Sequence, residues 1–160
     1  MSRKLVAYFS ASGVTARLAA SLADAIGADL YEIKPEVPYT KADLDWTDKK
    51  SRSTIEMQDT SFRPAIGGKD VNIADYNAIF VGFPIWWYIA PTIVNTFLES
   101  YDFSEKTIIP FATSGSSGLG KTIDNLRPSV SGAAILKEGK LLNGRPSKDD
   151  LAEWAASMNL

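Results

Sequence analysis

Residues 4–26, KLVAYFSASGVTARLAASLADAI, change their hydrophobic period part-way along. Residues 4–9 form a short apolar run rich in β-forming side chains, and a Ser/Gly cluster ends it, which is typical of a buried strand. From residue 15 to residue 26 the apolar side chains recur every three or four positions until Gly27, which is typical of an amphipathic helix and its stop signal. This stretch therefore predicts a strand, a tight turn and a helix in direct succession.

The same two periods alternate along the rest of the chain. Further strand-like runs cover residues 30–33, 77–83, 107–112 and 133–136. Helical spacing covers residues 91–101 and 121–126, and Ser147 with Asp150 forms a capping-box pattern that opens a last helix. Strands that alternate with helices predict an α/β fold: a three-layer, doubly wound, five-stranded parallel sheet with helices on both faces.

Two segments fit this alternation less directly. Residues 34–76 contain several prolines and many charges and are longer than an ordinary connection, so we expect a short helix at residues 45–53 and otherwise irregular cover over a site. Residues 136–143 predict either an extension of the last strand or a small hairpin through Glu138 and Gly139. Neither segment resembles a second domain, and residues 1–160 are predicted to form a single one.

Composition limits the chemistry that the side chains can perform. The chain of 160 residues has no cysteine and no histidine. This excludes disulfides, thiolate nucleophiles, iron–sulfur clusters, cysteine-rich zinc sites and Ser-His-Asp triads, and it removes histidine, the commonest ligand of transition metals. We therefore predict no metal site and name no catalytic side chain; an enzyme of this composition would rely on a bound cofactor.

Charge and hydropathy limit location and partners. The 17 basic and 19 acidic residues give a net charge of −2, without the basic surface that nucleic-acid binding requires. No stretch approaches the roughly 20 apolar residues that span a bilayer, and residues 5–9 are too short for a secretory signal. We expect a cytoplasmic protein that binds neither nucleic acid nor membrane.

In an open α/β sheet, ligands bind beyond the carboxyl ends of the strands, so the loops there are the candidate site. The first loop supplies hydroxyl groups from Ser10, Ser12 and Thr15, and Gly13 allows the backbone to approach a ligand closely. The amino terminus of the following helix would stabilise a phosphate. The alternative is a plain serine cap and turn.

The second loop carries three consecutive aromatic residues, Trp86, Trp87 and Tyr88, between Pro84 and Pro91. Three adjacent rings cannot all point into one core, whichever local period applies. Flat rings on a stiff loop suit stacking on a planar ligand. Alternatively, two of them fill the core or cover a dimer interface.

The third loop, residues 113–120, is rich in glycine and serine and suits backbone amides that contact a ring edge. Gly115 to Thr122 also satisfies the G-x-x-x-x-G-K-[ST] pattern of nucleoside triphosphatases. However, no predicted strand ends in the aspartate that would hold magnesium. Nucleoside triphosphate binding through this segment stays an alternative.

Taken in order, the three loops resemble those of the flavodoxin-like FMN-binding proteins, and the resemblance covers essentially the whole chain. It is similar to a bacterial branch with a Pro-x-Trp-Trp loop. The resemblance implies strand order 2-1-3-4-5, with FMN bound between the first and third strands. It implies that the phosphate is held by Ser10, Ser12, Gly13, Val14 and Thr15. It implies that the isoalloxazine contacts Pro84, Ile85, Trp86, Trp87 and Tyr88, together with Thr113, Ser114, Gly115, Ser116 and Gly118.

The function implied is that of an FMN-dependent oxidoreductase or electron-transfer protein, either a monomer or a homodimer. It would take electrons from NAD(P)H or a reductase and pass them to a quinone-like or protein acceptor. The third loop lacks the aromatic that sandwiches the flavin in electron-carrier flavodoxins, which favours two-electron reduction of a small acceptor. A competing hypothesis is a cofactor-free interaction module that uses Trp86, Trp87 and Tyr88 as a contact patch.

Overall fold

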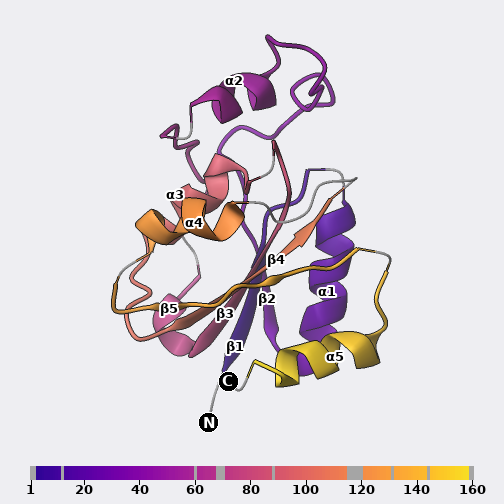
Figure 1. Ribbon diagram of the computed structural model, residues 1–160, viewed down its shortest axis with the longest axis vertical. Helices are drawn as coiled ribbons and strands as arrows, with labels where there is room; N and C mark the ends of the chain where they lie inside the picture. Colours follow the sequence, from indigo (N-terminus) through magenta and orange to yellow (C-terminus); the bar gives the residue numbers. More distant parts are fainter. Residues whose placement is uncertain are drawn as a thin grey trace.

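The central layer of the computed structural model (Figure 1) is a parallel sheet in the order β2-β1-β3-β4-β5. The short strand β6 also pairs with β4 and so shares the fifth position. The structure describes residues 3–11, 13–59, 61–67, 71–87, 89–114, 121–130, 132–143 and 145–158. Its strands are β1 (Lys4–Tyr8), β2 (Asp29–Glu32), β3 (Ala78–Pro84), β4 (Thr107–Thr113), β5 (Ile135–Leu136) and β6 (Lys140–Leu141). The predicted fold class and strand order are confirmed.

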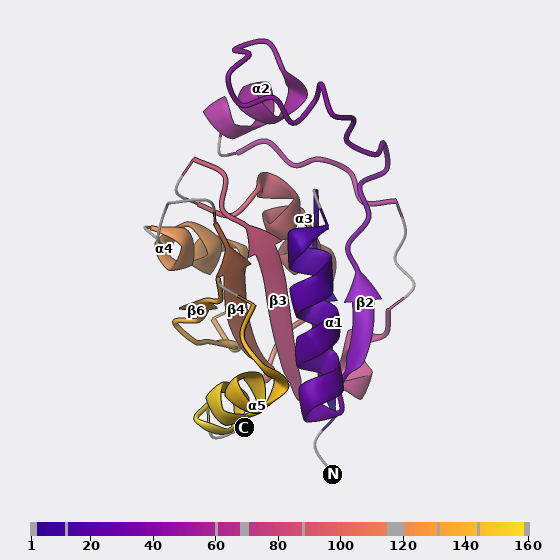
Figure 2. The same ribbon diagram turned by 90° about the vertical axis from the view of Figure 1, so that its right-hand side faces the viewer.

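Helices cover both faces of this sheet (Figure 2). They are α1 (Val14–Ile26), α2 (Arg52–Gln58), α3 (Thr92–Ser100), α4 (Thr122–Leu126) and α5 (Lys148–Ala156), with short 3₁₀ turns η1 (Ile73–Asp75) and η2 (Arg127–Ser129). Side chains of α1 and α5 share one core cluster, and those of α3 and α4 share the other. Ser147 and Asp150 form the predicted capping box at the start of α5. No helix in the described parts of the chain is long and apolar enough to cross a membrane.

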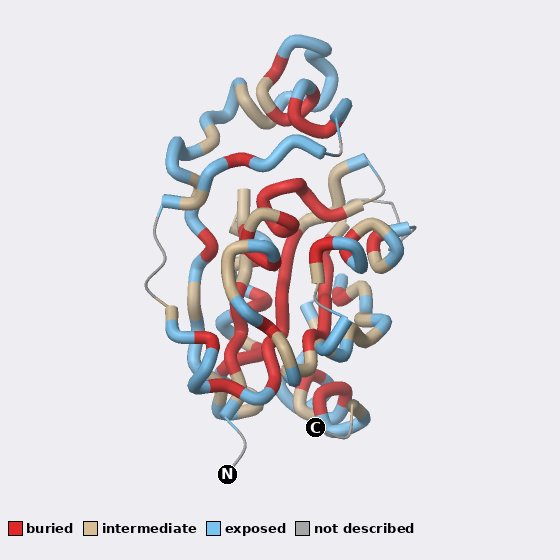
Figure 3. The backbone as a smooth tube through the Cα atoms, turned by 90° about the vertical axis from the view of Figure 1, so that its left-hand side faces the viewer, coloured by how far each residue is buried: buried red, intermediate tan, exposed pale blue. Residues whose placement is uncertain are grey.

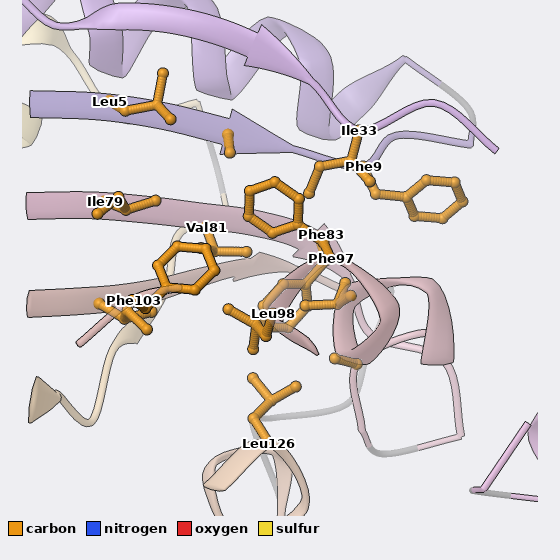
Figure 4. Close-up of a cluster of buried hydrophobic side chains, with 14 of the residues drawn as sticks. Leu5, Phe9, Ile33, Ile79, Val81, Phe83, Phe97, Leu98, Phe103 and Leu126 are labelled. Carbon is orange, nitrogen blue, oxygen red and sulfur yellow. The ribbon is translucent and has the colours of Figure 1, made fainter. Parts of the chain in front are cut away.

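Each face of the sheet has its own hydrophobic core, and the buried backbone concentrates in the central strands (Figure 3). On one face, Ile79 and Val81 of β3 pack with Phe97 of α3 and Leu126 of α4 (Figure 4). On the other face, Phe80 contacts Trp154 of α5 edge to face, with ring centroids 5.6 Å apart. Side chains therefore alternate between two helical layers along a strand that is covered on both sides.

Residues 135–141 form one edge strand with an interruption, and not the alternative hairpin. Both β5 and β6 run parallel to β4, with Ile135 opposite Thr107 and Lys140 opposite Phe111. Two residues of β4, 109 and 110, therefore face three edge residues, 137–139, which is a bulge. Pro110 lies at this bulge, where its missing N–H leaves the ladder incomplete.

The predicted helix at residues 45–53 is wrong, because α2 begins only at Arg52. The side chains of Asp45 and Asp48 accept hydrogen bonds from nearby backbone amides, at 3.0 Å from Thr47 and 2.9 Å from Lys50. These local turns compete with helix formation. Ser51 then accepts from the Thr54 amide and caps the helix.

The described residues in the range 34–67, between β2 and η1, form an insertion at one end of the sheet. In Figures 1 and 2, α2 stands beyond the carboxyl ends of the strands. At its base, the Glu36 amide donates to the Ala65 carbonyl at 2.8 Å, and the Gly67 amide donates to the Lys34 carbonyl at 2.7 Å. The segment that was expected to cover this end of the sheet is therefore closed at its base by hydrogen bonds between its own two ends.

Candidate functional site

The turn between β1 and α1 leaves two backbone donors at the helix start. Gly13, the residue before α1, has φ 93°, in the left-handed region that favours glycine. The Ser10 hydroxyl accepts from the amides of Gly13 at 3.1 Å and Ala16 at 3.2 Å, so it serves as the local cap. The amides of Val14 and Thr15 have no acceptor within the described ranges. Two N–H groups at a helix amino terminus are suited to an anion.

The first and third loops are joined by a pair of hydroxyl groups. Thr15 Oγ1 and Thr113 Oγ1 lie 2.8 Å apart, and the two residues are 2% and 6% exposed. One hydroxyl donates to the other, so the acceptor of the pair keeps its own hydrogen to donate elsewhere. The structure thus brings together two predicted site residues that are far apart in sequence.

The loop after β3 forms a tight turn between Trp86 and Ile89. The Trp86 amide donates to the Ile89 carbonyl at 2.9 Å, and the Ile89 amide donates back at 3.2 Å. Trp87, inside this turn, has φ 48°, which is uncommon for a residue with a side chain. The backbone of Ile85 is anchored to β4 by a 2.9 Å hydrogen bond to the Thr113 carbonyl.

The two tryptophans have different roles, which the sequence left open. The Trp86 ring packs edge to face against Phe9 and Tyr39, at centroid distances of 5.6 and 5.5 Å. Trp87 is 41% exposed. Trp86 therefore belongs to the packing under the turn, whereas Trp87 is accessible from outside. The predicted residues Pro84 and Ile85 are half-buried beside them.

The third loop contributes Thr113 and Ser114 within the described residues. The Ser114 amide donates to Asn143 Oδ1 at 2.9 Å. Asn143 follows β6 and was missed by the sequence reasoning, although an amide side chain directly after an edge strand is a signal that could have found it. The predicted site residues Ser12, Tyr88, Gly115, Ser116 and Gly118 lie outside the described residues.

The nucleoside triphosphatase pattern falls mostly outside the described residues as well, because these exclude residues 115–120. Of its final two residues, Lys121 is exposed before the short helix α4, and Thr122 is fully buried. A hydroxyl that holds magnesium in such a loop must face the phosphates. The burial of Thr122 therefore gives this alternative no support.

A cavity of about 390 Å³ lies beside the first turn, between α1 and the chain that follows β6. Val14 and Thr113 border it, and Arg17 and Arg145 bring positive charge from its two sides. No carboxylate is among the described residues that line it. The helix-start amides, which have no acceptor among the described residues, and the two arginines make this end of the sheet favourable for a negatively charged group.

Comparisons with known proteins show the family and the fold of this chain. Residues 3–158 match the family model of flavodoxin. No protein in a curated comparison set matches the chain. Among solved structures, a candidate flavoprotein of Bacteroides eggerthii is 48% identical with a TM-score of 0.93, covering 100% of this chain and 99% of that one. A candidate flavoprotein of Bacteroides uniformis is also 48% identical, with a TM-score of 0.90 over 97% of this chain and 98% of that one.

A more distant similarity extends to a ligand-bound structure. A flavoprotein of Lactobacillus acidophilus, crystallised in complex with FMN, is 20% identical with a TM-score of 0.69, covering 97% of this chain and 99% of that one. At this identity the likeness shows a shared fold.

Proposed function

This chain belongs to the flavodoxin family, and from that premise we propose that it binds FMN at the carboxyl edge of its sheet and takes part in electron transfer. The observation that carries the proposal is the turn at Gly13, where the amides of Val14 and Thr15 lie at a helix amino terminus and have no acceptor among the described residues. The exposed Trp87 ring supports the proposal, because a planar ligand needs a flat apolar partner. The FMN complex of the Lactobacillus acidophilus protein supports the choice of ligand.

Each loop has a distinct part in this proposal. Ser10, Gly13, Val14 and Thr15, with Ser12, hold the phosphate. Pro84, Ile85, Trp86 and Trp87, with Tyr88, lie along the ring system. Thr113, Ser114, Gly115, Ser116 and Gly118 line its other edge.

Bound FMN supplies the redox chemistry, since it can accept and release one or two electrons. The protein contributes binding and orientation. The sequence contains no histidine or cysteine that could act as a catalytic acid, base or nucleophile beside the ring. The flavin itself is therefore proposed as the reacting group.

The proposed electron donor is NAD(P)H or a reductase, and the proposed acceptor is a small quinone-like molecule. Residues 113–118 of the third loop include no aromatic side chain. This supports a flavin face that is open to a small acceptor, rather than a flavin held between two aromatic rings as in an electron carrier. A cytoplasmic location and a monomer or homodimer stay predictions.

A titration of the purified protein with FMN and with riboflavin tests the binding proposal. We expect one equivalent of FMN to bind with a change in its visible spectrum and quenched fluorescence. Riboflavin, which lacks the phosphate, should bind far more weakly. Equal affinity for the two ligands would remove the role of the first turn, and no binding of either would refute the function.

Stopped-flow reduction of the FMN-loaded protein tests the donor. Rapid bleaching of the flavin by NADH or NADPH is expected of a reductase. Absence of direct reduction, together with a stable semiquinone in titration, would instead identify a one-electron carrier.

A further inference from the structure

The insertion contains a partly buried cluster of a tyrosine, a carboxylate and an arginine. The Tyr39 hydroxyl donates to Glu56 Oε1. Arg52 Nε donates to Glu56 Oε2 at 2.9 Å, and the guanidinium carbon of Arg52 lies 3.8 Å from the centre of the Tyr39 ring. Glu56 is only 5% exposed. A carboxylate this deeply buried requires both partners, so the cluster acts as one unit.

The cluster holds the Tyr39 side chain at its hydroxyl and against one face of its ring. Arg52 Nη1 also donates to the Val37 carbonyl at 2.6 Å and so holds the backbone that leads to Tyr39. Burial, followed by the hydrogen bond to Glu56, raises the pKa of the Tyr39 phenol, which therefore remains a neutral donor. The ring has little freedom left to turn.

The fixed ring meets the site through Trp86. Tyr39, Phe9 and Trp86 form a triangle of edge-to-face contacts, with centroid distances from 5.5 to 5.6 Å. The three rings come from the insertion, the end of β1 and the turn after β3. Trp86 is adjacent to Trp87 in a turn closed by the hydrogen bonds between Trp86 and Ile89. A shift of the Trp86 ring would therefore move the exposed ring beside it.

We propose that Tyr39 is a positioning residue of the flavin site: held by Glu56 and Arg52, its ring fixes Trp86 and thereby the turn that carries Trp87. This inference rests on the proposed function and extends it. The insertion between β2 and β3 is then part of the binding site, since it sets the position of the turn that contacts the flavin.

The chain supplies its own matched control at the opposite end of the sheet. The Tyr76 hydroxyl donates to Asp29 Oδ2 at 2.7 Å, and the guanidinium carbon of Arg3 lies 5.0 Å from the Tyr76 ring centre. Arg3 also pairs with Asp29 at 2.9 Å. This trio again combines a tyrosine, a carboxylate (here an aspartate) and an arginine, but Tyr76 precedes β3, whereas the Trp86 turn follows it.

Four variants separate positioning from general stability: Tyr39→Leu, Tyr39→Phe, Tyr76→Leu and Tyr76→Phe. We expect Tyr39→Leu to weaken FMN binding about tenfold, because the edge contact on Trp86 is lost. Tyr39→Phe keeps the ring and should stay within about threefold of the wild type. Both Tyr76 variants should leave FMN affinity within about twofold, even where they lower the urea midpoint of unfolding. If Tyr39→Leu fails to fold, Tyr39→Met takes its place.

A second measurement needs no flavin. In the FMN-free protein, the indole N–H resonances of Trp86 and Trp87, assigned with Trp86→Phe and Trp87→Phe, should both shift in Tyr39→Leu and stay in place in Tyr76→Leu. Unchanged resonances in Tyr39→Leu would overturn the proposal, as would equal losses of FMN affinity in the two leucine variants. If wild-type protein takes up no FMN, the proposed function fails instead, and the indole resonances still decide whether Tyr39 fixes the turn.

Discussion

Thr15 and Thr113, 98 residues apart in the chain, share a hydrogen bond of 2.8 Å between their buried hydroxyl groups. Thr15 belongs to the first turn of α1, and Thr113 is the last residue of β4. The bond therefore couples the loop proposed to hold a phosphate to the loop proposed to line the flavin ring. Removing it should affect both stability and ligand binding.

Thr113→Val is expected to lower the free energy of unfolding by about 1 kcal/mol, because the Thr15 hydroxyl is left buried without its partner. It should also weaken FMN binding. Thr92→Val is the matched control: Thr92 is equally buried, but its hydroxyl has no partner among the described residues, so the change should be neutral or stabilising. Urea unfolding and FMN titration measure both effects. Equal stability of the two valine variants would contradict this role of the hydroxyl pair.

Gly13 allows the charge at the first turn to be tested apart from its shape. An added Cβ at Gly13 meets nothing within 4 Å, and asparagine and aspartate tolerate a positive φ better than other side chains. Gly13→Asn should therefore bind FMN within about tenfold of the wild type, whereas Gly13→Asp should bind at least about a hundredfold more weakly, because its carboxylate repels the phosphate. The two ligands to compare are FMN and riboflavin, since charge repulsion should disappear with riboflavin. An aspartate variant that binds FMN as well as the asparagine variant would place the phosphate elsewhere.

Local patterns were sufficient to predict the frame of the fold. The three-to-four spacing up to Gly27 predicted α1, and the pair Ser147 and Asp150 predicted the cap of α5. These features depend on neighbours within one helical turn. The five-stranded order was predicted from resemblance and is confirmed by the observed pairing.

Contacts between distant segments could not be predicted in the same way. Tyr39 lies in a proline-rich segment without a period, and its ring partners Phe9 and Trp86 are remote in sequence. The Asn143 contact with Ser114 likewise depends on the bulge that sets the edge strand in register. Such contacts arise only when the chain has folded, so a local pattern can mark a candidate residue but does not predict which residues meet.

Acid should weaken the link between the insertion and α3. Arg63 Nε donates to both carboxylate oxygens of Glu99, at 3.0 and 3.1 Å, and Ser129 Oγ donates at 2.6 Å. The Arg63 bond first, then the Ser129 bond, lowers the pKa of Glu99. The pKa of Glu99 in the folded protein therefore lies below its value in the unfolded chain, which is about 4.3. The stability that ionised Glu99 contributes is complete above about pH 4.3 and is lost as the pH falls through the pKa of the folded state.

Glu99→Gln should therefore be less stable than the wild type at pH 6, and its free energy of unfolding should fall less steeply between pH 5 and pH 3. Denaturant unfolding across this range measures both slopes. Glu153→Gln is a control, since Glu153 is exposed on α5 and has no ion pair within the described ranges. Parallel acid slopes for the wild type and Glu99→Gln would show that this carboxylate does not contribute.

The bulge at Gly139 is the last feature with a testable consequence. Gly139 has φ 77°, and an added Cβ would lie 2.3 Å from the Pro110 carbonyl oxygen. Gly139→Ala therefore combines backbone strain with a clash against main chain, and we expect it to lower the free energy of unfolding by about 2–4 kcal/mol. Gly132→Ala meets nothing within 4 Å and should be neutral or slightly stabilising.

The same substitution should also affect the candidate site, because the edge strand leads directly to Asn143. If Gly139→Ala changes the register of β6 against β4, Asn143 Oδ1 no longer reaches the Ser114 amide, and FMN affinity should fall together with stability. Asn143→Ala separates the two effects: it removes the hydrogen bond without straining the bulge, so it should weaken FMN binding while costing only about 1 kcal/mol of stability. Unfolding in urea and FMN titration of the three variants measure this. A Gly139→Ala protein as stable as Gly132→Ala would show that the bulge is not fixed by the close approach of Gly139 to Pro110.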